Sequence, residues 1–153
     1  MGYEENRLYY EDLEVGQNFL TDARVVTVAD VQMFAAISGD FRPQHMNETY
    51  GRTSPAGERT AHDLLGVAIA SGLRRPIAPI ATMAFMGFNM EFQAPLRIGD
   101  TIHSRQTVVE KRETKKDDRG IVRFRRELLN QDGKVIQTGD AMLMVHRKKN
   151  KGS

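Results

Sequence analysis

The chain has no cysteine among its 153 residues, and this absence excludes several kinds of chemistry. Disulfides, thiolate catalysis and zinc sites built on sulfur are all ruled out. No apolar stretch approaches the length of a membrane-spanning helix, and Glu4 and Glu5 stand where a signal peptide has a basic and then apolar run. We therefore expect a cytoplasmic protein that does not enter a membrane.

A strong excess of charge of one sign is also lacking. Lys and Arg number 22 against 20 Asp and Glu, so the formal net charge of +2 does not indicate a nucleic-acid partner. The local basic excess at Arg147, Lys148, Lys149 and Lys151 predicts a solvated tail over residues 148–153. With 40% hydrophobic residues, the chain is long enough for one packed domain, which we place at residues 1–147.

The first half of the chain predicts a short strand followed by a capped helix. Residues 18–27 have the β-branched and aromatic content of a strand, interrupted near Asp22. Thr27 is a typical N-cap residue, apolar side chains then recur at helical spacing over residues 28–38, and Gly39 is a typical helix end. One helical turn is expected at residues 46–50 and a loop at 51–57.

The second half predicts one helix and an antiparallel sheet. Residues 60–73 are small and apolar on nearly every face, which is typical of a buried central helix, and Arg74, Arg75 and Pro76 end it. A strand over 81–94 follows, whose core face would carry Ala84, Met86, Phe88, Met90, Phe92 and Ala94. Strands over 101–111, 121–129 and 134–146 come next, the last two joined by an Asp132-Gly133 hairpin turn. We expect an α+β fold in which the sheet curls around the helix.

The most informative stretch is the loop after the first helix, residues 38–47. It carries Asp40 and His45, a carboxylate and an imidazole that are able to hydrogen-bond one water and exchange its protons. Gly39 and Pro43 turn the chain between them. His103 and His146 lie on predicted strands among charged neighbours and have no ligand partner at metal spacing, so no metal site is expected.

Taken in order, these motifs resemble the MaoC-like dehydratases, whose best-known members are (R)-specific enoyl-CoA hydratases. The resemblance rests on a helix ending in Ser-Gly-Asp, His45 five positions after Asp40, an Ala-His pair at His62 opening a small-residue helix, a Phe-x-x-Pro strand end and a Gly-Asp turn. It covers roughly residues 8–147. The resemblance implies a single hotdog domain, in which a curved antiparallel sheet wraps a central helix at about residues 61–74, and a homodimer or higher oligomer.

The resemblance also implies an activity and its residues. Asp40 and His45 would hold the water that adds across the double bond of a trans-2-enoyl-CoA, or leaves an (R)-3-hydroxyacyl-CoA. The backbone N–H of Asp63, with His62 beside it, would meet the negative charge that develops on the thioester oxygen. From the residue alone, we favour a structural role for His62, capping or packing at the helix start. No cofactor is expected other than the CoA of the substrate itself.

The chain departs from the family pattern at several of these positions. Arg42, Gln44 and Asn47 stand where the family has Asn, an aliphatic residue and Asp, and Asp63 replaces a Gly. An Arg42 that lies against Asp40 would favour the ionised carboxylate, whereas an outward Arg42 would be free for a phosphate or an acidic acyl group. The Asp63 carboxylate would oppose charge on the thioester oxygen unless it turns away or is protonated.

Candidates for substrate binding extend beyond the loop. Arg42, Arg59 and Arg74, with Arg52 and Arg75, are candidates for phosphates of the CoA, and Ser71 is expected in an acyl pocket with Ala68, Gly72, Met86, Phe88 and Met90. Two alternatives to the lyase remain open. Hotdog proteins include acyl-CoA thioesterases, in which Asp40 would activate water against the thioester carbonyl, and the departures at Arg42 and Asp63 suit a non-catalytic acyl-CoA binder.

Overall fold

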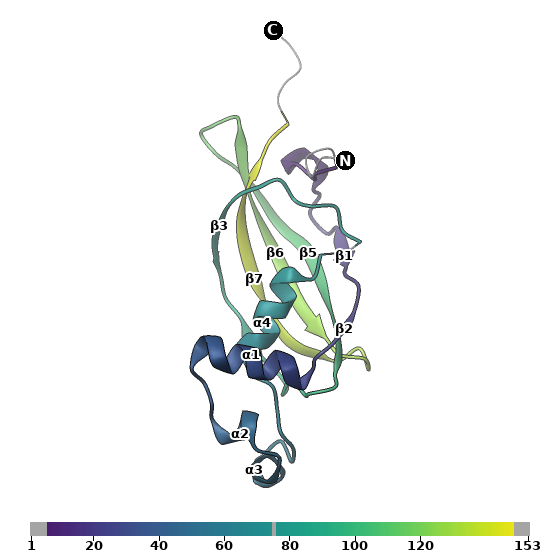
Figure 1. The fold of residues 1–153 in the computed structure, drawn as a ribbon. Helices are drawn as coiled ribbons and strands as arrows, with labels where there is room; N and C mark the ends of the chain where they lie inside the picture. The colour runs from purple at the N-terminus through teal and green to yellow at the C-terminus, as the bar shows by residue number, and fades with distance from the viewer. Residues whose placement is uncertain (1–5, 75, 149–153) are drawn as a thin grey trace.

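The computed structural model describes residues 6–74 and 76–148, and Figure 1 shows one sheet with the helices gathered on one of its faces. Three long strands form the centre of this sheet, namely β5 (Thr101–Glu113), β6 (Arg119–Leu129) and β7 (Val135–His146). The shorter strands lie outside them: β1 (Asn18–Leu20) and β2 (Arg24–Val25) pair with β5, while β3 (Thr82–Phe88) and β4 (Glu91–Phe92) pair with β7. All these pairs are antiparallel, in the order β1-β5-β6-β7-β3, which is the architecture expected from the sequence.

Helix α1 (Val28–Ser38) has the bounds that the sequence predicts. The Thr27 hydroxyl accepts a hydrogen bond from the Asp30 N–H at 3.1 Å, and the Asp30 carboxylate accepts one from the Thr27 N–H at 2.8 Å. At the other end Gly39 adopts φ 76°, a left-handed conformation that favours glycine. Local capping therefore fixes where the loop with Asp40 begins.

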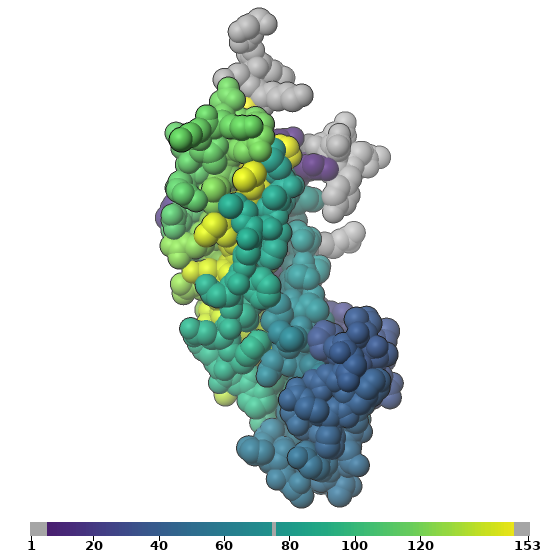
Figure 2. Space-filling model, turned by 90° about the vertical axis from the view of Figure 1, so that its left-hand side faces the viewer, coloured from purple at the N-terminus to yellow at the C-terminus, as the bar shows by residue number. Residues whose placement is uncertain are grey.

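Two short helices follow where one turn and a loop were expected. They are α2 (Pro43–Met46) and α3 (Glu48–Thr53), so the prediction of a loop over residues 51–53 is wrong. The Asn47 side chain accepts a hydrogen bond from the Tyr50 N–H at 2.9 Å and starts α3. Gly51 then packs against the backbone of Arg59, where a β-carbon would collide. Figure 2 shows this helical region (blue) as a lobe at one end of the molecule.

The central helix α4 (Asp63–Gly72) is shorter than the predicted 61–74 and lies across the inner face of the sheet (Figure 1). It is not buried on every side, because only Leu65 and Gly66 are fully buried and Leu64 is 58% exposed. Gly66 permits the closest approach to the sheet, since a β-carbon there would collide with the Gln137 side chain. No helix among residues 6–74 and 76–148 is long and apolar enough to cross a membrane.

Two apolar clusters cover the inner face of the sheet. The cluster under the helices is formed by Val26, Val31, Ala61, Leu65, Leu96, Ile102, Leu128 and Ile136. The other lies under the short η1 helix (Tyr10–Asp12) and is formed by Tyr10, Leu13, Val108, Val122, Phe124, Leu143 and Val145. Alternate residues of β5, β6 and β7 supply both clusters, as the period of two predicts, and the buried polar side chains of Ser104, Gln106 and Gln137 share the inner face.

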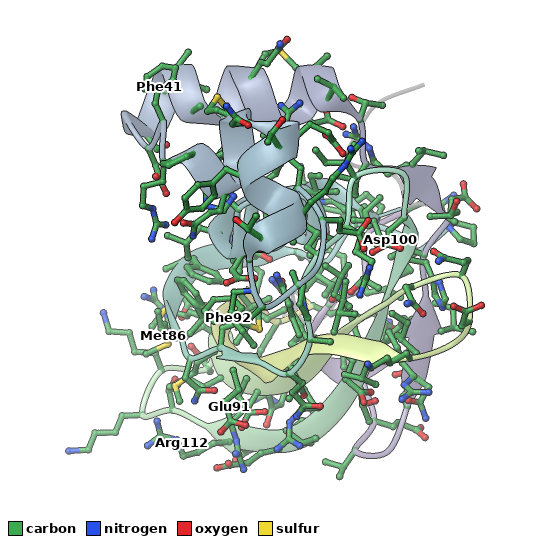
Figure 3. All side chains as sticks on the ribbon, turned by 90° about the horizontal axis from the view of Figure 1, so that it is seen from below. Phe41, Met86, Glu91, Phe92, Asp100 and Arg112 are labelled. Atoms are coloured by element: carbon green, nitrogen blue, oxygen red, sulfur yellow. The ribbon has the colours of Figure 1, made fainter. Side chains whose placement is uncertain are left out.

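The predicted strand over residues 81–94 is the clearest error of the sequence analysis. It divides into β3 and β4, and its pairing with β7 shifts register twice within β3. Phe85, Met86, Phe88 and Phe92 are each about half exposed, so these side chains do not form one core-facing row. In Figure 3, Met86 lies on the sheet side of the molecule, and Phe41 lies on the helix side. Gly87, with φ 156°, stands where the alternation is lost.

Lys148, the first residue of the predicted solvated tail, is exposed, and both it and the preceding Arg147 form ion pairs. Arg147 pairs with Glu11 at 2.8 Å, and its guanidinium lies 5.3 Å from the centre of the Tyr10 ring. The Lys148 ammonium pairs with Asp12. These contacts join the end of β7 to η1, and residues 149–153 lie outside the described part of the chain.

Candidate active site

Asp40 follows Gly39, the glycine that ends α1, and Arg42 binds the Asp40 carboxylate. The Arg42 guanidinium donates from Nε to Oδ1 at 2.8 Å and from Nη2 to Oδ2 at 2.7 Å, and the Arg42 backbone N–H also points to Oδ1 at 3.3 Å. These hydrogen bonds hold the pKa of the Asp40 carboxyl well below its usual range, although partial desolvation acts in the opposite direction. Asp40 is therefore ionised at neutral pH and is a hydrogen-bond acceptor only.

His45 comes from α2, whose first residue, Pro43, favours helical geometry there. Its ring is buried, and Nδ1 lies 2.9 Å from the carbonyl oxygen of Thr60. Because a carbonyl only accepts, Nδ1 carries the hydrogen and Nε2 carries the lone pair. Burial is the main cause that lowers the pKa of His45, so the ring is neutral at neutral pH.

The His45 lone pair faces the Asp40 carboxylate. His45 Nε2 is buried and has no hydrogen-bond partner among the described residues, and it lies 3.9 Å from Asp40 Oδ2. This separation is too long for a direct hydrogen bond and matches the span of one bridging water. The two groups that the sequence analysis paired are thus brought together without a direct contact.

His62 joins the site from the residue before α4 and makes no side-chain cap to that helix. Its Nε2 lies 2.8 Å from the backbone carbonyl oxygen of Asp40, so Nε2 carries the hydrogen. The ring stacks on His45 with centroids 3.9 Å apart and meets Phe34 at 4.9 Å. His62 therefore fixes the backbone of Asp40 and one face of the His45 ring.

Asp40, His45 and His62 form a group of potential metal ligands, with ligand atoms within 4.8 Å of one another. Their hydrogen bonds do not suit a metal ion. The His62 Nε2 that faces Asp40 Oδ2 at 4.0 Å carries a hydrogen for the Asp40 carbonyl, and the two imidazole rings are nearly parallel, so their lone pairs do not converge. The arrangement is better suited to proton transfer.

Asp63 begins α4 next to this pair. The first hydrogen bond of the helix runs from the Leu65 N–H to the His62 carbonyl, so the N–H groups of Asp63 and Leu64 lie ahead of it, at the positive end of the helix dipole. The Asp63 side chain is exposed at a pocket of about 530 Å³ that His45, Tyr50 and Phe92 also line. Desolvation raises the pKa of the Asp63 carboxyl, while His45, Arg42 and His62 act to lower it.

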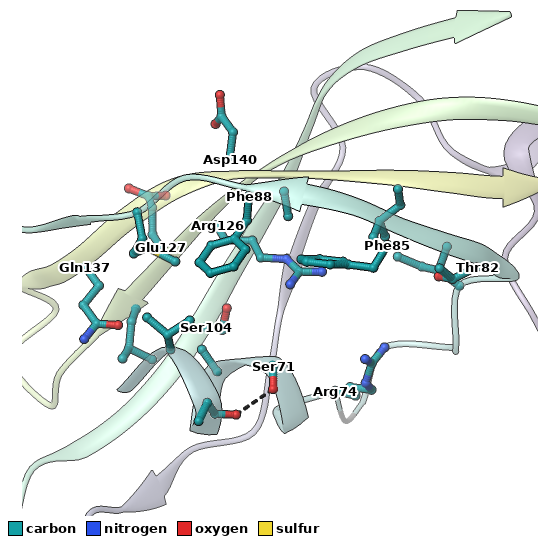
Figure 4. A pocket seen from close by; sticks show the side chains of 18 of the residues that line it. Ser71, Arg74, Thr82, Phe85, Phe88, Ser104, Arg126, Glu127, Gln137 and Asp140 are labelled. Carbon is teal, nitrogen blue, oxygen red and sulfur yellow. Dashed lines mark hydrogen bonds between the residues drawn. The ribbon is translucent and has the colours of Figure 1, made fainter. Parts of the chain in front are cut away.

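The remaining predicted residues lie in two places. Arg59 donates a hydrogen bond from Nε to the His45 carbonyl oxygen at 2.5 Å, so it stabilises the position of α2. Ser71 and Arg74 line a second pocket, of about 610 Å³, between α4 and the sheet (Figure 4). Ala68, Phe88 and Met90 line it as well, as the sequence analysis expects, whereas Met86 borders a different hollow. Arg75 lies outside the described residues.

Sequence reasoning missed two residues near the site. Gln137 of β7 is buried and donates from Nε2 to the Asp63 carbonyl oxygen at 2.8 Å, which joins the sheet to the first turn of α4. Arg126 of β6 points into the larger pocket (Figure 4). The sequence does contain a signal for both residues. Each is polar at a position where the two-residue period of its strand predicts an inward, apolar side chain.

The ion pair at Asp40 is testable by substitution of Arg42. The variant Arg42→Gln removes both guanidinium hydrogen bonds, so we expect the pKa of the Asp40 carboxyl to rise toward its ordinary value of about 3.9. Carboxyl-carbon NMR during a pH titration measures this directly. Arg52→Gln, at an exposed arginine of α3, should leave the Asp40 titration unchanged. Identical Asp40 titrations in Arg42→Gln and the unmodified protein would show that the ion pair does not form in solution.

Comparisons with known proteins show which family the chain resembles. The family model described as the MaoC like domain matches residues 12–127. An (R)-specific enoyl-CoA hydratase of Rhodospirillum rubrum is 33% identical over 137 residues, which cover 90% of this chain and 91% of that protein. The crystal structure of the MaoC-like dehydratase from Rhodospirillum rubrum superposes with a TM-score of 0.83 at 32% identity, over 93% of this chain and 99% of that one.

A more distant structure supports the fold alone. A Mycobacterium tuberculosis protein described as having a double hotdog fold superposes with a TM-score of 0.80 at 17% identity, over 96% of this chain and 46% of that one. The sheet, the helix across it and the residues matched by the family model together lead to one assignment. The chain belongs to the MaoC-like dehydratase family and has the hotdog fold.

Proposed function

We propose that this protein is a lyase that reversibly hydrates trans-2-enoyl-CoA to (R)-3-hydroxyacyl-CoA, with Asp40 and His45 as its acid–base pair. The observation that carries the proposal is the unpartnered His45 Nε2, buried 3.9 Å from an ionised Asp40 carboxylate. The hydratase and dehydratase relatives support the same reaction class. Both facing atoms are hydrogen-bond acceptors, so the site is complementary to the two hydrogens of one water.

The protonation states of His45 and Asp40 determine which group acts in each of the two steps of hydration. His45 Nε2 takes a proton from the water while the water oxygen bonds to the β-carbon, and the Asp40 carboxylate orients the water and stabilises the imidazolium. The π electrons of the double bond move toward the thioester, and the α-carbon then takes the proton back from His45. Because neither group carries a proton at its facing atom beforehand, the proton delivered is the one removed from water. Dehydration is the reverse.

The start of α4 is the proposed place for the thioester carbonyl. The Asp63 N–H, ahead of the first helical hydrogen bond, is suited to stabilise the enolate oxygen, and His62 holds this segment against Asp40. Arg42 stays on Asp40 and keeps it ionised. For Arg59, Ser71 and Arg74, contact with the substrate is a proposal, and the Arg59 hydrogen bond to His45 favours support of α2 as its main role.

A homodimer suits the free edge of the sheet. β3 has no strand beyond it in the described chain, and it carries half-exposed Phe85, Met86 and Phe88. Pairing of this edge with a second copy would cover them. The reaction as written needs no cofactor beyond the CoA of the substrate, and the cytoplasmic location expected from the sequence stays a prediction.

Substitution of the pair tests the proposed chemistry. Asp40→Asn and His45→Ala should each lower kcat by at least about a hundredfold. His45→Ala removes the proton acceptor, and Asp40→Asn removes the negative charge that orients the water and stabilises the imidazolium. The measurement is loss of enone absorbance when crotonyl-CoA is hydrated. Asp22→Asn and His103→Ala are matched controls away from the site and should keep full activity. Release of free thiol would instead indicate a thioesterase, and binding of acyl-CoA without either signal would indicate a non-catalytic binder.

The pH dependence of kcat/KM provides a second test. Burial lowers the pKa of His45, so the neutral, accepting ring should persist below the ordinary value of about 6.5. We therefore expect activity to remain constant as pH falls from 8 through about 6.5 and to decline only at lower pH, as His45 gains a proton. A midpoint at or above that value would contradict the assignment of His45 as the buried base.

The effect of Asp63 on the reaction is tested by Asp63→Asn. This variant keeps the backbone N–H and the side-chain shape but removes a negative charge close to the developing enolate. We expect kcat to rise roughly threefold to tenfold, as for the loss of a repulsion of about 1 kcal/mol between partly solvated charges. Asp132→Asn in the β6–β7 turn is the matched control. A fall in kcat would show that the Asp63 carboxylate assists the reaction.

A further inference from the structure

The larger pocket contains an arginine whose charge is not balanced. The pocket is enclosed by α4 on one side and by β3, β6 and β7 on the other, and most of its lining is apolar. Arg126 enters it from β6, and Arg74 from the end of α4 (Figure 4). In that view the Arg126 side chain is directed toward the space between α4 and the strands.

Arg126 is largely withdrawn from water. Its Nε is buried and has no hydrogen-bond partner among the described residues. Desolvation, with the nearby charge of Arg74, lowers the pKa of Arg126. A guanidinium in such a place ordinarily has a carboxylate beside it, because an unpaired buried charge is costly.

The two acidic residues that line the pocket are already paired elsewhere. Glu127 accepts from Arg105 at 2.6 and 2.9 Å. Asp140 accepts from Arg125 at 2.5 Å and from Arg123 at 3.0 Å. Within residues 6–74 and 76–148, neither Arg126 nor Arg74 therefore has a carboxylate partner.

Gln137 links the pocket to the proposed thioester site. It lines the pocket and holds the Asp63 carbonyl oxygen at the first turn of α4. Gln137 pairs with Leu128 across β6 and β7, and Arg126 is two residues from Leu128 on the same face, about 7 Å further along the strand. On this spacing the guanidinium lies within the length of a short acyl chain from the first turn of α4.

We propose that Arg126, assisted by Arg74, binds a carboxylate at the far end of the acyl group, so that the preferred substrates are CoA thioesters of dicarboxylic 2-enoic acids. This inference rests on the proposed hydratase function and specifies its substrate class. A terminal carboxylate would accept two hydrogen bonds from the guanidinium and neutralise it, whereas a methyl end would leave it unpaired.

Binding of unreactive ligands tests the proposal without any turnover. Adipoyl-CoA and hexanoyl-CoA have the same number of acyl carbons and differ in the terminal carboxylate. By calorimetry on the full-length protein, adipoyl-CoA should bind at least about tenfold more tightly, and Arg126→Met should abolish that preference. Arg126→Lys should retain part of it. Arg112→Met, at an exposed arginine of β5 outside this pocket, is the control and should retain all of it.

Thermal unfolding separates binding from folding. Loss of a buried unpaired charge should leave the melting temperature of Arg126→Met unchanged or higher, so weak adipoyl-CoA binding by this variant would not be an effect of unfolding. Equal binding of the two ligands by the unmodified protein, or a preference that survives Arg126→Met, would overturn the proposal. The first result would mean that another group, such as an acid of a second copy, already pairs with Arg126. The second would mean that another cation, such as Arg74, recognises the terminal carboxylate.

Activity distinguishes this proposal from the function on which it rests. Hex-2-enedioyl-CoA should be hydrated with a higher kcat/KM than hex-2-enoyl-CoA, by at least about tenfold. Hydration of both at equal rates would refute the dicarboxylic preference and leave the hydratase function intact. A preference for adipoyl-CoA in binding, with hydration of neither enoyl thioester, would refute the hydratase function and retain the carboxylate site.

Discussion

The site depends on two buried imidazoles that each give their one N–H to a backbone carbonyl. His45 donates from Nδ1 to Thr60, and His62 donates from Nε2 to Asp40. Each hydrogen bond selects one tautomer, and the His45 bond leaves the Nε2 lone pair directed at the Asp40 carboxylate. The same two bonds tie the loop after α1 to the segment before α4, so the hydrogen bonds that build the site also set its chemistry.

Local sequence predicted the parts of this arrangement that lie close together in the chain. Thr27 and Gly39 are cap residues whose effect is local, and α1 has the predicted bounds. Asp40 and His45 are five positions apart in the chain, so their proximity needed no knowledge of the sheet. The contact between His62 and Asp40 spans 22 residues and depends on how α4 crosses the sheet, which no periodicity specifies. The family resemblance, rather than the pattern, placed His62 and Asp63 near the pair.

Errors arose where apolar residues are not buried within one chain. Met86 and Phe88 have the alternation of a core-facing strand, yet both are about half exposed at the edge of the sheet. Leu64, on a helix that is apolar nearly all round, is exposed for the same reason, because nothing in the described chain covers that side of α4. A hydrophobic pattern in the sequence indicates that a surface favours burial. It does not indicate whether the same chain or another molecule buries that surface.

Polar atoms without partners connect the catalytic pair to the larger pocket. Buried side-chain nitrogens and oxygens nearly always have hydrogen-bond partners, and in the described chain the exceptions include His45 Nε2, Gln137 Oε1 and Arg126 Nε. Gln137 contacts the Asp63 carbonyl at the first turn of α4, and it lines the larger pocket together with Arg126. A water at His45 and an acyl group with a polar end at Arg126 would satisfy two of these three atoms at once. In the free protein, polar atoms that line the proposed substrate site thus lack hydrogen-bond partners. An acyl group with a polar end would supply a partner, and this requirement restricts which acyl groups fit the site.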